Sequence, residues 1–555
     1  MVGKSDDEPR LQSRSDATPI ELFFDLFFVA NLSTFTATHE IHNVNALGAY
    51  IGFLGVIWFT WLQVTLFDIR FARDSVFERV CKAIQLGAMV GFASAGTRFT
   101  ARIRDENVWA FQSLTLILAG SRMLLAIQYT INLAFIYPSM KSAAKGVTYT
   151  AVMFWTTTFC YLGMYRIFSH ATGSGSRIWI FWFVIFGIEM WTVMGLSCVF
   201  PEIGFQKSHL NVRMGLLTLI IIGEGVIAVT RIVNKTVRPG GWTKWSFVHI
   251  LGVTSNVYLL WQVYFDVCPR GWLGRLSQQL WVQLHFPFHV ALILLLEGSQ
   301  ILALTLDVTL KLKYLRQTIS FVCEEPRPDS VKAVELIRTM ILDMEIPFSR
   351  GAMQEWMAIS RILKDLAHTS LCTGRGAISV MYTDDIFGDL MGNVTAALFS
   401  SMDITPVKGD ISLLDHQQLL KMYMELLQFV YIYFFIVASI SMSLFTAFLV
   451  LSCRYQRRLF LALSVMVRLL LAILMASLVS FSRYFPLAYS FMTSPIILYA
   501  FTLTLLTVLL VDRLLDGRDA ACRRKQENSA QLRPSASAPV MTEDNSTSAV
   551  GKIPE

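Results

Sequence analysis

The chain has 555 residues, of which 54% are hydrophobic and only 16% are charged, whereas an average soluble domain is about 25% charged. An ordinary soluble protein cannot hide so much apolar surface, so the composition excludes that class. The net charge of +7 is spread over loops and tail, which argues against nucleic acid as a partner and favours anionic lipid headgroups.

Apolar stretches recur along the chain between short polar segments. A hydrocarbon layer about 30 Å thick needs about 20 apolar residues per helical span, and about twelve stretches reach this length. They are residues 21–39, 47–67, 80–95, 108–131, 147–167, 179–200, 214–233, 245–267, 281–306, 427–451, 459–481 and 486–511. The sequence therefore predicts an all-α, polytopic transmembrane helix bundle in contact with a lipid bilayer.

Residues 307–421 interrupt this pattern. Their charge density is typical of soluble amphipathic helices, so they are predicted to form an inserted extramembrane helical domain. The insertion separates a bundle of residues 18–306 from a C-terminal three-helix membrane part of residues 422–511. Asn393 begins an Asn-Val-Thr sequence, which would accept a glycan if the insertion faces the lumen.

Both ends of the chain are polar. Residues 1–17 carry charges of both signs, lack the features of a cleaved signal peptide and are predicted to be disordered. Residues 512–555 begin basic and become rich in Ser, Pro and Ala, which predicts a disordered cytosolic tail. The Lys and Arg bias of most loops favours cytosolic termini, although two outer loops are also basic.

The first predicted span begins with two carboxylates, Glu21 and Asp25, four residues apart. This spacing places them about 40° apart on one helical face. Two ionised carboxylates one turn apart repel each other unless a cation, an arginine or a proton lies between them. Asp25 is therefore a candidate ion-binding residue, and Glu21 is either another or a solvated residue at the helix start.

The seventh span contains Arg213 and Glu224, eleven residues apart and so on the same face. Arg213 is expected at the membrane surface and Glu224 deep in the apolar helix. Gly223 and Gly225 flank Glu224 and leave room for a neighbouring helix or a small ligand. Glu224 is predicted to be functional, and the alternative is a structural hydrogen bond between helices.

The ninth span contains His285, His289 and Glu297, and the two histidines share a face. Proton or ion handling is the favoured interpretation. A metal site and a set of structural polar groups remain as alternatives. Pro287 is expected close to the helix start, where it costs little.

Two further ionisable residues lie within predicted spans, Arg122 in the fourth and Glu189 in the sixth. Each needs a partner of opposite charge, so Arg122 is predicted to be neutralised by Asp25, Glu189 or Glu224. Arg468 in the eleventh span is expected to extend its long side chain toward the interface in a structural role.

Several motifs resemble those of the low-temperature-requirement A family of bacterial and fungal membrane proteins. TPIELFFDLFFVANLS resembles the family's first signature, and FDIR after the second span resembles its FD-x-R. Further similarities involve Arg213, Gly215, Leu216, Gly223 and Glu224, then Trp261, Tyr264, Phe265 and Asp266, then His285, Pro287 and His289. The resemblance covers about residues 18–306 and implies a multi-pass protein, here of the fungal type, without implying a substrate.

These features predict a transporter or channel-like protein for a proton, an ion or a small solute. The first alternative is a non-transporting membrane sensor or scaffold whose insertion and tail bind partners. A membrane-embedded enzyme comes third, because the sequence lacks G-x-S-x-G and a phosphate-binding loop. No C-x-x-C pair suggests a zinc or redox site. No cofactor and no metal are predicted.

Overall fold

The computed structural model describes residues 17–39, 41–71, 75–170, 177–206, 208–237, 242–269, 273–324, 330–348, 352–368, 385–402, 416–452, 458–483, 494 and 496–531. Helices make up the regular structure of these residues, which confirms the predicted all-α fold. In chain order they are α1 (Pro19–Thr38), α2 (Val44–Phe71), α3 (Val76–Gly96), α4 (Val108–Ile136), α5 (Lys141–His170), α6 (Ile180–Val199), η1 (Pro201–Ile203), α7 (Leu210–Thr236), α8 (Lys244–Val267), α9 (Arg275–Glu324), α10 (Ser330–Asp343), α11 (Met353–His368), α13 (Asp385–Ser401), α14 (His416–Ser452), α15 (Arg458–Ser480), η4 (Phe481–Arg483) and α17 (Ile496–Gln531).

The described helices confirm a polytopic membrane protein. Nine of them are long and apolar enough to cross a membrane: α1, α2, α4, α6, α7, α9, α14, α15 and α17. Helices α3, α5 and α8 coincide with the three remaining predicted spans but are more polar, with residues such as Lys82 and Arg166. The predicted number of about twelve spans is therefore approximate.

Helix α2 lies at the centre of the N-terminal group of helices α1–α6. It is buried over almost its whole circumference, and Trp58 and Trp61 are fully enclosed. A helix that is apolar all round must be covered on every side, and α1, α3, α4, α6 and α9 pack around α2. Any polar atom on α2 therefore has to find its partner on one of these neighbours.

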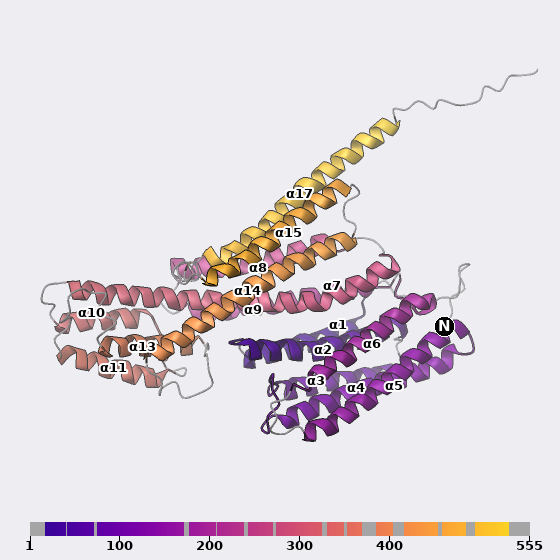
Figure 1. Cartoon of the computed structure of the whole chain (residues 1–555), viewed down its shortest axis with the longest axis horizontal. Coiled ribbons are helices and arrows are strands. Elements are labelled where there is room, and N and C mark those ends of the chain that lie inside the picture. The colour runs from indigo at the N-terminus through magenta and orange to yellow at the C-terminus, as the bar shows by residue number, and fades with distance from the viewer. Residues whose placement is uncertain are drawn as a thin grey trace, which may run out of the picture.

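Helices α7 and α9 connect the two groups of membrane helices. Helix α7 packs on α1 and α9, while α9 also packs on α14. In Figure 1 these two helices run between α1–α6 and the group formed by α8, α14, α15 and α17. Polar side chains on the inner faces of α7 and α9 consequently lie in the middle of the molecule.

The outer surface of the bundle is apolar. Large hydrophobic side chains such as Phe159, Phe181, Leu470 and Ile473 are 60–65% exposed. A surface patch of this kind needs an apolar partner, and together with the apolar helices it shows that the protein contacts the lipid bilayer.

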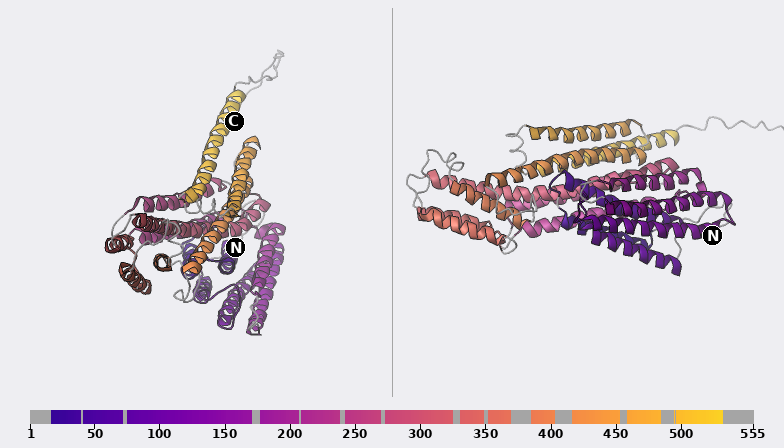
Figure 2. Two further views of the ribbon diagram at one scale, coloured as in Figure 1. Left: turned by 60° about the vertical axis from the view of Figure 1, so that its left-hand side comes forward. Right: turned by 60° about the horizontal axis from the view of Figure 1, so that its bottom comes forward.

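Helix α9 is far longer than a membrane span. Its 50 residues correspond to about 75 Å, against a hydrocarbon thickness of about 30 Å. The distal part of α9 packs with α10 and α13, α11 packs on both of these, and α13 reaches the start of α14. Figure 2 shows this group, here called the side bundle, at one end of the molecule.

The predicted boundary at residue 307 falls inside α9, which continues without a break to Glu324. Whether residues 307–421 lie outside the bilayer remains a prediction, as does glycosylation of Asn393. The Asn393 amide lies in α13 and donates a hydrogen bond to the Asp389 carbonyl at 2.8 Å. Residues 1–16 and 532–555 of the predicted disordered ends are outside the described residues, whereas residues 512–531 continue helix α17.

Two expectations about single residues were wrong. Pro287 lies in the interior of α9, twelve positions from its first residue, because the helix begins at Arg275 and not near the predicted span start. Arg468 does not extend to the interface. It is buried between α15 and α17, where Asp512 binds it with two hydrogen bonds of 2.7 and 3.1 Å.

We predict that the glycine at position 55 is required for the packing of α2 on α6. A Cβ atom there would lie 2.4 Å from the Phe183 ring, whereas one at Gly87 of α3 would meet nothing within 4 Å. Gly55→Leu should lower the free energy of unfolding by about 1–3 kcal/mol, the usual cost of overpacking. Gly87→Leu is the matched control. Equal thermal stability of the two purified variants in detergent would contradict the packing.

Candidate functional site

The strongest buried ion pair joins α7 to α1. Arg213 donates hydrogen bonds of 2.7 and 2.8 Å to the two carboxylate oxygens of Asp25, and both side chains are fully buried. The Trp61 indole donates a third bond, 2.7 Å, to Asp25 Oδ1. The first turn of α7 is enclosed by α1 and α2, and Asp25 supplies the compensating charge. The position of Arg213 at the membrane surface stays a prediction.

Glu21 lies one turn before Asp25 and is also buried, with 4% of its surface exposed. It accepts a hydrogen bond from the Thr18 backbone N–H at 2.8 Å, which satisfies one of the free amides at the start of α1. Its other oxygen is 3.4 Å from His209 Nε2. Glu21 is therefore not a solvated residue, because the segment that leads into α7 covers the beginning of α1.

The Arg122 side chain is neutralised by Glu189, as the sequence predicted. Arg122 donates three hydrogen bonds of 2.9–3.0 Å to the Glu189 carboxylate and one of 3.1 Å to Thr60 Oγ1. Both charged side chains are completely buried near the middles of α4 and α6. The pair joins these two helices to α2.

The two histidines of α9 are held in fixed tautomers. Trp58 Nε1 can only donate, and it lies 2.9 Å from His289 Nδ1, so this nitrogen accepts. His289 Nε2 then carries the proton and donates to Thr218 Oγ1 at 2.8 Å, while Thr218 donates to the Met214 carbonyl. Each ring nitrogen thus has a partner, and the ring is neutral.

His285 has the opposite tautomer. Its Nδ1 lies 2.6 Å from the Trp281 carbonyl oxygen and must donate, so Nε2 accepts from the Tyr264 hydroxyl at 2.8 Å. The two rings are 5.4 Å apart. No group of three His, Cys, Asp or Glu side chains with the arrangement of a metal site occurs among the described residues, and His285, His289 and Glu297 do not form one.

Glu224 has one bound and one unbound oxygen. Arg231, about two turns further along α7, donates to Glu224 Oε1 at 3.1 Å and also approaches Ser33 of α1 at 3.4 Å. Oε2 is buried and has no hydrogen-bond partner among the described residues, although the Ser33 hydroxyl lies close enough to interact with the carboxylate. Although Arg213 and Glu224 share a face of α7 as predicted, each has a different charged partner.

Gly225 brings Glu224 close to α9. A Cβ atom at this position would lie 2.6 Å from Leu296, next to Glu297. The Tyr50 hydroxyl of α2 is within electrostatic reach of both Glu224 and Glu297, and it shares a hydrogen bond of 2.6 Å with Thr36. Glu297 is also close to Tyr433 of α14. Tyr50 thus lies near both carboxylates, one on α7 and the other on α9.

The polar side chains follow one another along the interface of α1, α2, α7 and α9. Along the axis of α7, Thr218 lies about 12 Å and Glu224 about 21 Å from the first residue of the helix. Asp25 lies about 9 Å from the first residue of α1, and the beginnings of α1 and α7 are at the same end of the bundle. The order is Glu21 with His209, Asp25 with Arg213, His289 with Thr218, and Glu224 with Glu297. We call this series the polar ladder.

Several partners in this region were not predicted. Trp58, Trp61 and Thr218 are ordinary span residues in the sequence, and Tyr264 was named only as part of a family motif. Only the three-dimensional structure shows that these residues hold the charged and histidine side chains. Asp68 and Lys82 form a buried ion pair between α2 and α3. The FDIR motif could have indicated this pair, because it places the Asp68 carboxylate within an apolar helix.

We predict that Asp25 and Arg213 are energetically coupled. Asp25→Asn should leave the Arg213 charge unpaired and lower the free energy of unfolding by about 3–5 kcal/mol. In the double variant Asp25→Asn with Arg213→Gln no buried charge is left, so its loss should be clearly smaller than the sum of the two single losses. Thermal unfolding of all four proteins in detergent measures the coupling. Simple additivity would contradict a direct pair.

Comparison with known proteins identifies the family of this chain. The family model described as bacterial low temperature requirement A protein (LtrA) matches residues 16–317, which is more than half of the chain and includes the whole polar ladder. Neither the curated proteins nor the solved structures gave a match. The match confirms the resemblance found in the sequence motifs, while the fungal type remains a prediction. The chain belongs to the low temperature requirement A family.

Proposed function

We propose that this protein is a transporter or channel-like protein that moves a proton or a small cation along the polar ladder. The observation that supports this most directly is the unpartnered oxygen of Glu224 in the interior of a membrane helix. A buried acceptor without a partner costs about 1–3 kcal/mol, so a proton, a water molecule or a cation at this oxygen would stabilise the protein. Glu224 would be the residue that binds the transported ion.

Arg231 gives the proposed site a competing internal cation. Its side chain is 28% exposed and its contact with Glu224 is a single 3.1 Å bond, in contrast with the bidentate, fully buried pair of Arg213 and Asp25. A partly exposed, singly bonded arginine is the easier one to displace. An arriving proton or cation would replace Arg231 at Glu224, and the return of Arg231 would release it.

Glu297 would provide the second carboxylate of the site. Tyr50 lies within electrostatic reach of both acids, and Gly225 allows the two helices that carry them to approach closely. Two acidic groups sharing one region of low dielectric favour binding of a single positive charge between them. The site would therefore bind one cation or one proton at a time.

The histidines have a different role in this proposal. Both rings are neutral and both nitrogens of each are occupied, so protonation of His289 would require the loss of the Trp58 hydrogen bond. They would hold α2, α7, α8 and α9 in register around the conduction path. Asp25 with Arg213, and Arg122 with Glu189, would act in the same way as rigid charged crosslinks.

The scaffold alternative is supported by a separate observation, the side bundle. Helices α10, α11 and α13 pack beside the distal part of α9, and Met353 and Met357 on α11 are at least half exposed. Methionine-rich surfaces suit adaptable protein contacts. This surface would serve a partner-binding protein without any ion movement.

We predict that Glu224→Gln abolishes most of the ion flux. Purified protein in liposomes containing a pH-sensitive dye would be given a potassium diffusion potential, with sodium or potassium gradients tested in parallel. Gln retains size and hydrogen bonding but cannot exchange a proton or carry charge, so the rate should fall at least about tenfold. Glu297→Gln should also reduce the rate.

The control is Glu106→Gln, which removes an exposed carboxylate, 77% accessible, outside the ladder. Its flux should equal that of the unmodified protein. Size-exclusion chromatography establishes that every variant is folded. Unmodified protein that moves none of these ions, or a Glu224→Gln variant with full flux, would reject the transport proposal and favour the scaffold.

A further inference from the structure

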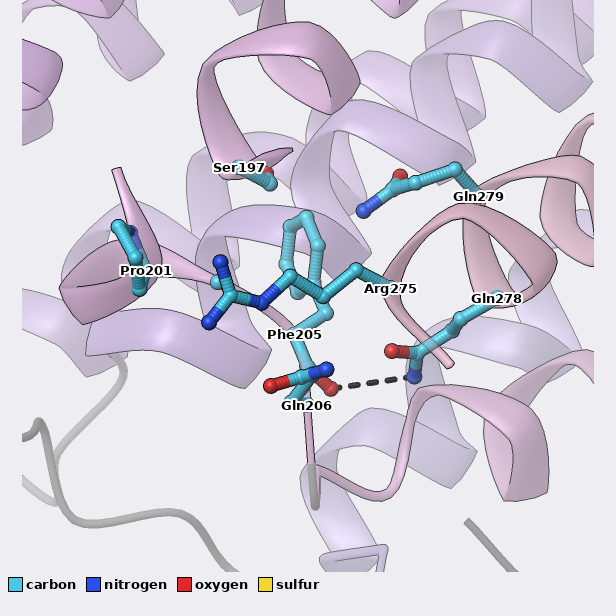
Figure 3. Close-up of a pocket in the computed structure, with 8 residues that line it drawn as sticks. Ser197, Pro201, Phe205, Gln206, Arg275, Gln278 and Gln279 are labelled. Carbon is cyan, nitrogen blue, oxygen red and sulfur yellow. Dashed lines mark hydrogen bonds between the residues drawn. The ribbon is translucent and has the colours of Figure 1, made fainter. Parts of the chain in front are cut away.

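A shallow recess that opens to solvent lies at the end of the bundle where α9 begins. Ser197 at the end of α6, Phe205 in the segment before α7, and Arg275, Gln278 and Gln279 in the first turns of α9 line it. Figure 3 shows the side chains of Arg275 and Gln279 directed across this space. The Gln278 amide donates to the Phe205 carbonyl at 3.1 Å, which fixes the floor.

A buried arginine lies directly behind the lining. The Arg70 guanidinium stacks 4.0 Å from the Phe205 ring centre and donates to Ser197 Oγ, to the Val193 carbonyl at 3.2 Å and to Tyr129 at 3.5 Å. All of these partners are neutral, and Arg70 Nε has no partner in the part of the chain that the structure describes.

Arg70 differs in this respect from the other buried arginines of the described residues. Arg122, Arg213 and Arg468 each bind a carboxylate with two or more hydrogen bonds. Arg70 has no carboxylate partner among the described residues. An uncompensated buried cation is strongly unfavourable. An anion close to Phe205 and Ser197 would remove that cost.

The beginning of α9 adds donors at the same place. Gly274 accepts the first helical hydrogen bond, from Gln278 N at 2.9 Å, and has no side chain to cap the amides that follow. Free first-turn amides and the helix dipole attract anions. The Arg275 side chain supplies a second, solvent-exposed guanidinium.

Gln279 adds a neutral donor at the recess. Its side chain is only 6% exposed, and Figure 3 shows its amide nitrogen directed into the recess. An amide N–H donates, so it can bind a phosphate oxygen.

We propose that the recess binds a phosphate group. Arg275, the first amides of α9 and the Gln279 amide nitrogen donate to its oxygens, and Arg70 supplies the charge behind the wall. The group belongs either to a phospholipid headgroup or to free inorganic phosphate, and the site is independent of Glu224 and of ion movement along the polar ladder.

The test uses the full chain purified in detergent and two probes. Binding of inorganic phosphate is measured by calorimetry, and retention of phosphatidylglycerol or phosphatidylserine is measured by native mass spectrometry after passage through nanodiscs. At least one probe should bind, and Arg275→Gln should weaken it about tenfold through loss of a charged donor. Gln279→Leu should weaken it too.

Arg361→Gln, which removes an exposed arginine of α11, is the matched control and should bind normally. Arg275 is exposed, so its replacement leaves the fold intact, and thermal unfolding establishes this. Saturable phosphate binding identifies the ligand as free inorganic phosphate. Lipid retention without phosphate binding identifies the ligand as a phospholipid headgroup. Failure of both probes to bind, or equal binding by Arg275→Gln and Arg361→Gln, overturns the proposal.

Discussion

The arrangement of this protein depends on the need to neutralise charge inside a membrane. A charged side chain within the hydrocarbon region is expensive unless an opposite charge and further hydrogen bonds meet it there. Arg213 with Asp25 fixes α7 against α1, Arg122 with Glu189 fixes α4 against α6, and Asp512 with Arg468 fixes α17 against α15. Each pair joins helices from different parts of the chain, so the helices cannot exchange neighbours without separating charges.

Against this background, the groups that are not fully paired stand out. Glu224 shares a single bond with a partly exposed arginine, and Arg70 has only neutral partners. A positive charge would be stabilised beside Glu224, and a negative charge would be stabilised near Arg70. The other buried arginines of the bundle are paired with carboxylates, whereas Glu224 and Arg70 are not fully paired. For this physical reason we propose a cation site at Glu224 and an anion site near Arg70.

The sequence predicted the fold well because membrane spans obey a simple length and polarity rule, and a described helix overlaps each long apolar stretch. It also named Glu189 among three candidate partners of Arg122, because a buried arginine in a span needs a carboxylate. It did not show that Arg213 is enclosed by protein and pairs with Asp25, because contacts between helices cannot be read from the sequence of one helix. Nor did it find Trp58, Trp61 or Thr218, whose importance lies in contacts between helices and not in their own chemistry.

Pro287 has a mechanical consequence for the long helix α9. Proline has no backbone N–H, so the carbonyl of Gln283 lacks its helical donor at this point, and prolines are common sites of helix bending. The pivot lies between His285 and His289, with the phosphate recess on one side and the side bundle on the other. A bend of about 5° there would displace the distal end of α9, about 55 Å away, by about 5 Å. Any bending at Pro287 would therefore be amplified at the side bundle.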